Sequence, residues 1–251
     1  MAKNGELNGR VALVTGAGRN IGRAIALALA ADGAAIVVNA RSNRAEAEAV
    51  AKEIETDGGK AMAVLADVAD ADAVERMATE AVKRFGRIDY LVNNAAMRGE
   101  IQLDQMTLAD WRKVMSVTLE GAFNCMKACL PHLRKSGAGA IINIGGLSAH
   151  TGAKHRVHVI TSKAGIVGFT RGLAHDLAGD NITVNCVSPG LINTARDPKA
   201  PEPQHHSTLN TLRGTYGGSE DVAATVRFLC GPGARYITGQ TIHVNGGAFV
   251  G

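Results

Sequence analysis

The alternation of short apolar runs with longer helical patterns is the feature that most restricts how this chain can fold. The runs "RVALVTG" (10–16) and "AAIVVNA" (34–40) are typical of buried strands. Between them, "IGRAIALALAADG" (21–33) is typical of a helix that ends at a glycine. The alternation continues and predicts strands at 61–68, 88–96, 139–146, 182–190 and 241–247, and helices at 44–59, 70–86, 107–133, 159–179 and 219–230.

Repeated strand–helix units with apolar strands predict a parallel sheet that helices cover on both faces, a doubly wound α/β fold. Asp70 or Asp72 is the expected N-cap of the third helix, and Thr107 opens the fourth. No composition break divides the chain, so residues 1–251 are expected to form a single domain. The segment at about 193–216 is rich in Pro and His and weakly periodic, which predicts a lid over the carboxyl edge of the sheet.

Composition excludes several classes of function. The chain contains no run of about 18 apolar residues, so a membrane span is not expected. The start "MAKNGELNGR" does not resemble a signal peptide, which favours the cytoplasm. The net charge of +4 comes from scattered Lys and Arg with few aromatic residues, so nucleic-acid binding is not expected. Cys125 and Cys129 lie one helical turn apart and are expected to be core thiols rather than metal ligands.

The segment "TGAGRNIG" (15–22) joins the first strand to the first helix and predicts a phosphate-binding turn. Gly16 permits a tight turn, Gly22 lets the helix pack close to the sheet, and N–H groups at the helix start can hold a pyrophosphate. Asn20 stands where a further glycine is expected, but Asn tolerates unusual dihedral angles. The predicted cofactor-binding residues here are Gly16, Gly18, Arg19, Asn20, Ile21 and Gly22.

The end of the second strand indicates which dinucleotide binds. Sites that select the cofactor without a 2′-phosphate usually place an acid there, to accept from the ribose hydroxyls. This chain has Ala40, Arg41 and Ser42 instead, with Arg19 in the glycine-rich turn nearby. Because guanidinium groups bind phosphate through a fork of donors, these residues predict NADP(H) rather than NAD(H).

Further motifs give the chain a family resemblance over nearly its whole length. They are "LADV" (65–68), "NNAA" (93–96), "SKAG" (162–165), "SPGLINT" (188–194) and "ITGQTIHVNGG" (237–247). With the glycine-rich turn, they resemble the short-chain dehydrogenase/reductase family, and are similar to its 3-oxoacyl-carrier-protein reductases and sugar dehydrogenases. The resemblance implies a Rossmann-like sheet of seven strands, often a tetramer, and hydride transfer between nicotinamide and a carbonyl or alcohol. It adds as cofactor-binding residues Asp67, Val68, Asn93, Asn94, Ala95, Lys163, Pro189, Gly190, Ile192 and Thr194.

In that family an Asn, a Ser, a Tyr and a Lys perform the proton chemistry, with Tyr and Lys one helical turn apart. Here the Lys position is Lys163, but the Tyr position is Val159, the Ser position is Gly146 and the Asn position is Thr118. Neither Val nor Gly has a side-chain proton donor. The cofactor half of the site is therefore expected to remain, while the usual route of proton transfer is missing.

Substitutes for the missing acid lie in the same stretch of sequence. Ser148 follows Gly146 by two residues, and His155 precedes Val159 by one helical turn, so it shares that face if the helix extends so far. His158 is expected to point aside, and a surface or loop role stays open for each histidine. Other candidates are His150, Thr161, His205 and His206, but their spacing supports no metal site.

Three functions remain open at this point. The first is an NADP(H)-dependent oxidoreductase with a non-standard site, acting on a carbonyl, an alcohol or an activated C=O or C=N bond. The second is an inactive subunit that pairs with an active homologue, and the third is lyase or dehydratase chemistry in the same pocket. The expected partners are a small-molecule substrate and further subunits, in a homo-oligomer (dimer or tetramer) or a hetero-oligomer with a homologue.

The cofactor assignment predicts the effect of replacing Arg41. The Arg41→Ala variant should lose affinity for NADPH and keep its affinity for NADH, because only NADPH carries the phosphate that the guanidinium would bind. Titrations followed by nicotinamide fluorescence measure both affinities. Equal losses for the two cofactors would count against the assignment.

Overall fold

In the part of the chain that the structure describes, seven parallel strands form one sheet, in the order β3-β2-β1-β4-β5-β6-β7. The computed structural model describes residues 5–195 and 210–251. The predicted doubly wound α/β fold with a Rossmann-like parallel sheet is confirmed, and every neighbouring pair of strands is parallel. The strands are β1 (Val11–Val14), β2 (Ala35–Ala40), β3 (Lys60–Leu65), β4 (Tyr90–Asn93), β5 (Ala140–Ile144), β6 (Thr183–Pro189) and β7 (Thr241–Val244).

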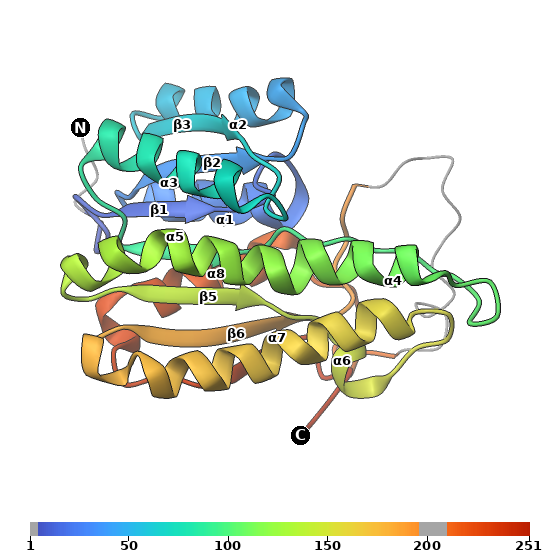
Figure 1. Ribbon diagram of the computed structural model, residues 1–251. Coiled ribbons are helices and arrows are strands. Elements are labelled where there is room, and N and C mark those ends of the chain that lie inside the picture. Colours follow the sequence, from blue (N-terminus) through green and yellow to red (C-terminus); the bar gives the residue numbers. More distant parts are fainter. Residues whose placement is uncertain (1–4, 196–209) are drawn as a thin grey trace.

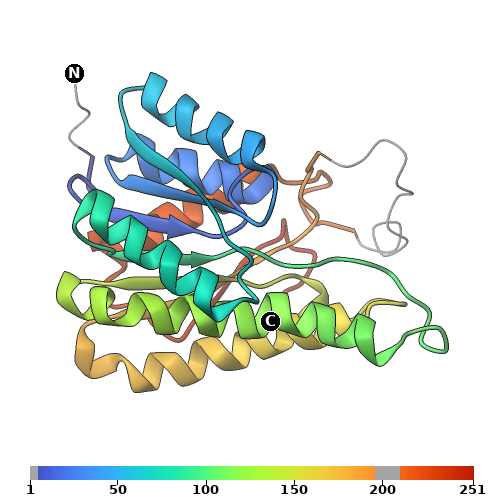
Figure 2. The same ribbon diagram turned by 45° about the horizontal axis from the view of Figure 1, so that its top comes forward.

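Helices cover both faces of the sheet (Figures 1 and 2). One core cluster packs α1, α2 and α8 against the strands, and a second packs α3, α5 and α7 against the opposite face. Both clusters consist mostly of Ala, Val, Ile and Leu, as the apolar strand pattern predicts. The helices are α1 (Asn20–Ala31), α2 (Arg44–Thr56), α3 (Ala71–Phe85), α4 (Leu108–Met115), α5 (Gly121–Ser136), α6 (Ser148–Thr151), α7 (Val157–Asp176) and α8 (Ser219–Cys230), with short 3-10 turns η2 (Ala178–Asp180) and η4 (Pro232–Ala234).

The predicted helix starts are confirmed where capping side chains lie. Asp70, not Asp72, is the N-cap of α3, and its side chain accepts from Ala73 N. Thr107 caps α4 in a capping box with Asp110. The expectation of one uninterrupted helix over 107–133 was wrong, because the π-helical segment η1 (Ser116–Glu120) separates α4 from α5. Such segments often occur at functional sites.

Several expectations concern segments other than the main elements. The short helix α6 is not apparent from the sequence pattern. Most of the predicted lid falls on residues 196–209, outside the described residues, as do His205 and His206. All four cysteines are buried free thiols. Among the described helices, none is both long and apolar enough to cross a membrane.

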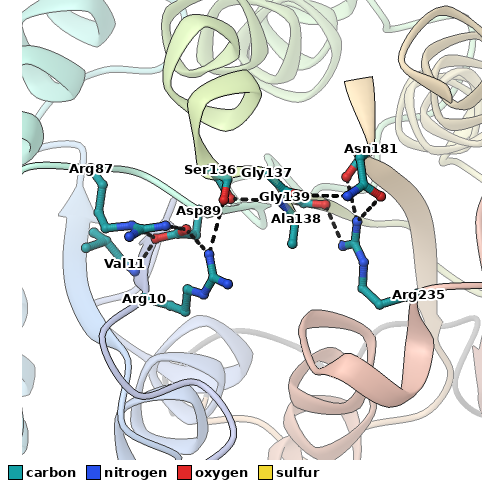
Figure 3. Close-up of polar contacts among 10 residues, drawn as sticks. All are labelled: Arg10, Val11, Arg87, Asp89, Ser136, Gly137, Ala138, Gly139, Asn181 and Arg235. Carbon is teal, nitrogen blue, oxygen red and sulfur yellow. Dashed lines mark hydrogen bonds and ion pairs between the residues drawn. The ribbon is translucent and has the colours of Figure 1, made fainter. Parts of the chain in front are cut away.

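A buried carboxylate joins the amino-terminal edges of β1 and β4 (Figure 3). Asp89 is fully buried, and its oxygens accept from Arg10 Nη1 at 2.9 Å, from Arg87 Nη2 at 2.6 Å and from the backbone N–H of Val11 at 2.9 Å. Burial raises the pKa of Asp89, but these donors outweigh burial and hold the pKa below its ordinary value. The network therefore stabilises the sheet at the edge opposite the predicted site.

The Asp89 network predicts a pH-dependent contribution to stability. A carboxylate whose pKa is lowered on folding contributes stability at pH values above about 4, and this contribution is lost as the pH falls further. Asp89→Asn should therefore lower the free energy of unfolding by about 3 kcal/mol at pH 7 and flatten its fall in acid. Urea unfolding at several pH values measures both effects.

Asp180→Asn is the matched control, because Asp180 pairs with the half-exposed Arg134 at the surface. It should change the free energy of unfolding by less than about 1 kcal/mol. Similar losses in the two variants would contradict the role of Asp89.

Candidate functional site

The parallel sheet gathers the predicted site residues at one edge. The glycine-rich turn follows β1, Arg41 follows β2, Asp67 follows β3, and Asn93 ends β4. Gly146 follows β5 and Pro189 ends β6. Because parallel strands have their carboxyl ends on the same side, residues far apart in sequence meet here. Figure 1 shows α4 and α6 on this side of β5, beyond the end of the strand.

The glycine-rich turn has no room for side chains at two of its glycines. Gly16 has a φ of 61°, which favours glycine. A Cβ atom added at Gly22 would lie 2.3 Å from the Gly16 carbonyl oxygen and 2.6 Å from Asn94 Nδ2. The close approach that the sequence predicts for Gly22 is therefore present.

Two side chains tie this turn to the end of β4. Thr15 Oγ1 accepts from the backbone N–H groups of Asn94 at 2.9 Å and Ala95 at 3.0 Å. In return, Asn94 Nδ2 donates to the carbonyl oxygens of Thr15 at 2.8 Å and Gly16 at 3.0 Å. Asn94 and Ala95, both predicted to bind the cofactor, thus shape the turn. Thr15 has the same role and was missed by the sequence analysis.

The start of α1 has the character of an anion site. Asn20 has a φ of 51°, a left-handed conformation that Asn tolerates, as its position in the motif predicts. The helix has no side-chain cap and no acid in its first turn, and α1 carries the positive end of its dipole there. Asn20 Nδ2 donates to the Ala195 carbonyl oxygen at 3.2 Å, which links the turn to the segment after β6.

At the second strand, basic and acidic side chains lie near the glycine-rich turn. Arg19, Arg41 and Ser42 are exposed, as the predicted phosphate contacts require. Glu46 lies beside Gly18, with its Oε2 3.4 Å from where a Cβ atom on Gly18 would be. The sequence analysis missed Glu46, whose place in the first turn of α2 is typical of a helix-dipole acid. It also missed the buried Asn39, whose Oδ1 accepts from Gly16 N–H.

The segments that follow β3 and β6 contribute close packing and turn geometry to the site. Asp67 Oδ1 accepts from Ala69 N–H and holds the turn after β3. Val68 packs on Gly121, where an added Cβ atom would lie 2.6 Å from Val68 Cγ2. On the other side of the edge, a Cβ atom added at Gly190 would lie 2.6 Å from Asn245 Cα. Ile192 forms a bridge to Gly217, and Thr194 is half-buried at the end of the same segment.

Lys163 is the central charged group of the site. Its side chain is buried, at 9% exposure, and Nζ donates to the Ile144 carbonyl oxygen at 2.6 Å. Burial, together with the positive charges of Arg98 and Arg156, lowers the pKa of Lys163 to about 8, although the Cys186 thiol acts in the opposite direction. The amine therefore titrates close to neutral pH.

Of the residues at the family's other catalytic positions, Gly146 and Val159 lie beside this lysine. A Cβ atom added at Gly146 would lie 3.9 Å from Lys163 Cγ, an ordinary contact, so this position faces the lysine and has room for a side chain. Val159, one turn earlier on α7, is 2% exposed. Thr118 lies in η1, and its buried Oγ1 has no hydrogen-bond partner among the described residues.

The three tyrosines of the chain lie elsewhere or point to solvent. Tyr90 is buried in the core on β4, where burial raises its pKa to about 12. Half of the Tyr216 side chain is exposed, and Tyr236 is fully exposed.

The condition set for His155 is not met. His155 does not share the face of Val159, because α7 begins at Val157 and His155 lies in the loop before it, exposed and with a φ of 59°. His158 is buried, at 1% exposure. Ser148 is buried and begins α6, two residues after Gly146.

A buried polar relay behind the site was also missed by the sequence analysis. Asn93 Nδ2 donates to Asn143 Oδ1 at 2.9 Å, and Asn143 Nδ2 donates to Thr170 Oγ1 at 3.0 Å. These residues link β4, β5 and α7 through the core. The sequence signal for such a relay is an Asn in an otherwise apolar strand, as at Asn93 in β4 and Asn143 in β5.

Comparison with known proteins identifies the class to which this fold and site belong. The sequence matches the family described as Enoyl-(Acyl carrier protein) reductase over residues 16–248. The chain belongs to the short-chain dehydrogenase/reductase family.

Among individual relatives, it is 40% identical to the 3-oxoacyl-acyl-carrier-protein reductase FabG of Staphylococcus aureus, over 95% of this chain and 98% of that protein. It is 43% identical to the 3-oxoacyl-acyl-carrier-protein reductase of Synechocystis, over 96% and 97%.

Solved structures agree with the fold. A dehydrogenase/reductase from Sinorhizobium meliloti superposes with a TM-score of 0.92 at 37% identity, covering 97% of this chain and 96% of that one. A short chain dehydrogenase from Burkholderia cenocepacia in complex with NADP gives 0.90 at 37%, covering 97% and 99%. A metagenomic blue fluorescent protein in complex with NADPH gives 0.91 at 38%, covering 98% and 100%.

The buried lysine predicts how stability depends on alkaline pH. A lysine whose pKa is lowered on folding is deprotonated in the folded state and protonated in the unfolded state between about pH 8 and pH 10. Stability then rises with pH through that window, by up to about 1.4 kcal/mol per pH unit.

Buried thiols with raised pKa values, such as Cys186, act in the opposite direction, so the comparison must be a difference between variants. Lys163→Met should remove the lysine term alone. The free energy of unfolding of Lys163→Met minus that of wild type should therefore fall from pH 8 to pH 10. A difference that is constant across this range would mean that Lys163 has an ordinary pKa.

Proposed function

We propose that this protein is a cytoplasmic NADP(H)-dependent oxidoreductase that transfers hydride between the nicotinamide and a carbonyl or alcohol, with an activated C=O or C=N bond as the favoured substrate. The observation that carries the proposal is the buried Lys163 amine beside the open position at Gly146, next to a nucleotide turn that is complete. The similarity to reductases and to structures that hold NADP or NADPH supports it.

The residues present fit the dinucleotide. Gly22 has no room for a side chain and Gly16 has a left-handed backbone, which suits a close backbone approach to the pyrophosphate. The uncapped start of α1 offers N–H groups to the same phosphates. Arg19, Arg41 and Ser42 would hold the 2′-phosphate, with enough positive charge to offset Glu46. When bound, the reduced cofactor supplies the hydride.

Lys163 supplies the proton in this proposal. During reduction, the carbonyl carbon gains a hydride, and the carbonyl oxygen takes a proton from the Lys163 ammonium, which is recharged from solvent. A pKa of about 8 suits this role, because a general acid works best near the working pH. In the family that this chain resembles, the same lysine lowers the pKa of a tyrosine, so its task here would change from tuning an acid to being one.

Hydroxyl groups near Lys163 are assigned to the substrate oxygen. Ser148 lies just past Gly146, where the family places its serine, and is buried at the start of α6. Thr118 of η1 offers a buried hydroxyl that has no partner within residues 5–195 and 210–251. His155 receives no role in proton transfer, because it lies outside α7 and is exposed.

Apolar side chains on the surface offer contacts to further subunits. Leu108 of α4 is 60% exposed, and Phe123 of α5 and Phe228 of α8 are about half-exposed. We therefore propose a homo-oligomer, a dimer or a tetramer. A subunit that lacks activity and pairs with an active homologue is the second candidate, and the absence of a phenol at Val159 favours it.

Kinetics at different pH values test the assignment of the acid. In wild type, kcat/KM for NADPH-dependent reduction of a carbonyl panel should be constant at low pH and fall above about pH 8, as the Lys163 ammonium loses its proton. Lys163→Arg keeps the charge but not the titration, so its rate should fall by about 10²- to 10⁴-fold without an alkaline limb. NADPH fluorescence confirms that each variant still binds the cofactor.

The double variant Val159→Tyr with Gly146→Ser separates the two candidate functions. If Lys163 is the acid, restoring the family residues should change the rate of reduction only modestly. A gain of 10²-fold or more would mean that wild type has lost its acid rather than replaced it. That result would overturn the proposal in favour of the inactive subunit.

A further inference from the structure

Glu46 brings a carboxylate to the glycine-rich turn. A Cβ atom added at Gly18 would lie 3.1 Å from Glu46 Cβ and 3.4 Å from Glu46 Oε2, so the acidic side chain lies along this part of the turn. Because Gly18 has no side chain, Glu46 packs on the backbone that a dinucleotide is expected to approach. The acid comes from the first turn of α2 and not from the end of β2, where dinucleotide sites usually place one.

Backbone contacts fix the position of Glu46 relative to this turn. Gly16 N–H donates to Asn39 Oδ1 at 3.3 Å, and Ala17 N–H donates to the Asn39 carbonyl oxygen at 2.8 Å, so the end of β2 is joined to the turn. Asn43 then caps α2, and its Oδ1 accepts from Glu46 N–H at 3.2 Å. Glu46 therefore lies in the corner between the turn and the end of β2.

The helix that carries Glu46 does not use its carboxylate. In α4, the acid at the third helical position closes a capping box with the N-cap residue, but in α2 Glu46 does not. The neighbouring Arg44 pairs with Glu48 at 3.4 Å on the exposed side of α2. Within the described parts of the chain, the half-buried Glu46 carboxylate has neither a hydrogen-bond donor nor an ion-pair partner. It is thus available to accept from a ligand.

Two kinds of group meet at this corner of the site. Arg19 and Arg41 are exposed cations, one in the turn and one after β2, and guanidinium groups suit the 2′-phosphate of NADPH. Glu46 has the opposite chemistry: a carboxylate accepts from ribose hydroxyl groups and repels a phosphate. The ribose of NADH has a 2′-hydroxyl group that can donate, whereas NADPH carries negative charge at the same oxygen. The two cofactors should therefore respond to Glu46 with opposite signs.

We propose that Glu46 accepts from the ribose hydroxyl groups of NADH, so that this protein binds NADH as a second cofactor beside NADPH. A hydrogen bond from a hydroxyl to a carboxylate is charge-assisted and stronger than one between neutral groups. With NADPH, Arg19 and Arg41 hold the phosphate while Glu46 repels it, which limits the preference for NADPH. This inference rests on the dinucleotide site of the proposed function and names a specificity-determining residue in it.

The Glu46→Met variant tests the inference, because methionine has a similar length but neither a charge nor a strong acceptor. Its dissociation constant for NADH should rise about fivefold, because a hydrogen bond to a charged group is lost. Its dissociation constant for NADPH should fall about threefold, because the repulsion is removed. Nicotinamide fluorescence measures both constants without any substrate. Weaker binding of both cofactors, or an unchanged constant for NADH, would overturn the inference.

A second variant separates the acceptor from the charge. Glu46→Gln loses the charge but keeps an amide oxygen that can accept, so it should bind NADPH as tightly as Glu46→Met does and keep more of the affinity for NADH. Glu55→Met is the matched control, because Glu55 is an exposed acid about two and a half turns further along α2. It should leave both constants at the wild-type values. Equal shifts in Glu55→Met and Glu46→Met would mean that net charge alone acts, which would overturn the role of Glu46.

Calorimetry with the adenosine halves of the cofactors separates the inference from the proposed function. 5′-AMP has a free 2′-hydroxyl group, 2′,5′-ADP has a 2′-phosphate, and neither has a nicotinamide. Compared with wild type, Glu46→Met should bind 5′-AMP more weakly and 2′,5′-ADP more tightly. This result would support the role of Glu46 even if the protein reduced no carbonyl compound. Equal binding of each nucleotide by the two proteins would contradict that role, even if turnover confirmed the oxidoreductase.

Discussion

The shared direction of all seven strands is the constraint on which the rest of the molecule depends. Because every strand is parallel, all their carboxyl ends lie at one edge, and residues from Gly16 to Gly190 meet there. The opposite edge is held by the buried Asp89 between Arg10 and Arg87. Ion pairs thus stabilise the amino-terminal edge of the sheet, while the carboxyl-terminal edge holds the residues of the candidate site.

The ligand-binding edge has two halves with different chemistry. In the first, Thr15 and Asn94 fix the glycine-rich turn through backbone groups, so the shape of the cradle does not depend on any charged side chain. In the second, Lys163 is buried beside Gly146 and Val159, with Arg156 about two turns earlier. A lysine placed among cations and away from water gives up its proton more easily, as the role proposed for Lys163 requires.

The sequence predicts those features that depend on local rules. Asn20 takes the left-handed backbone expected at a position where glycine is usual, and Asp70 and Thr107 cap their helices because short polar side chains accept from the first turn. The order of strands and helices follows from the apolar pattern, because strands buried on both faces must be continuously apolar.

The features that the sequence does not predict depend on contacts between distant segments. The start of α7 at Val157 leaves His155 in a loop, although the spacing alone would place it on the helix. No local pattern indicates that the loop after β4 lies against the segment before α7, where Ile101 N–H donates to the His155 carbonyl oxygen. The π-helical segment around Thr118 likewise breaks a sequence that reads as one regular helix.

The acid–base behaviour of the Lys163 amine carries the central claim, and a titration of that single group tests it most directly. With 13C-labelled lysine, the ε-carbon resonance of Lys163, assigned by its loss in Lys163→Arg, can be followed against pH in the protein. The account predicts a midpoint near 8. A midpoint near the ordinary lysine value of about 10.4 would contradict it, because such an ammonium would hold its proton too tightly to act as an efficient general acid near neutral pH.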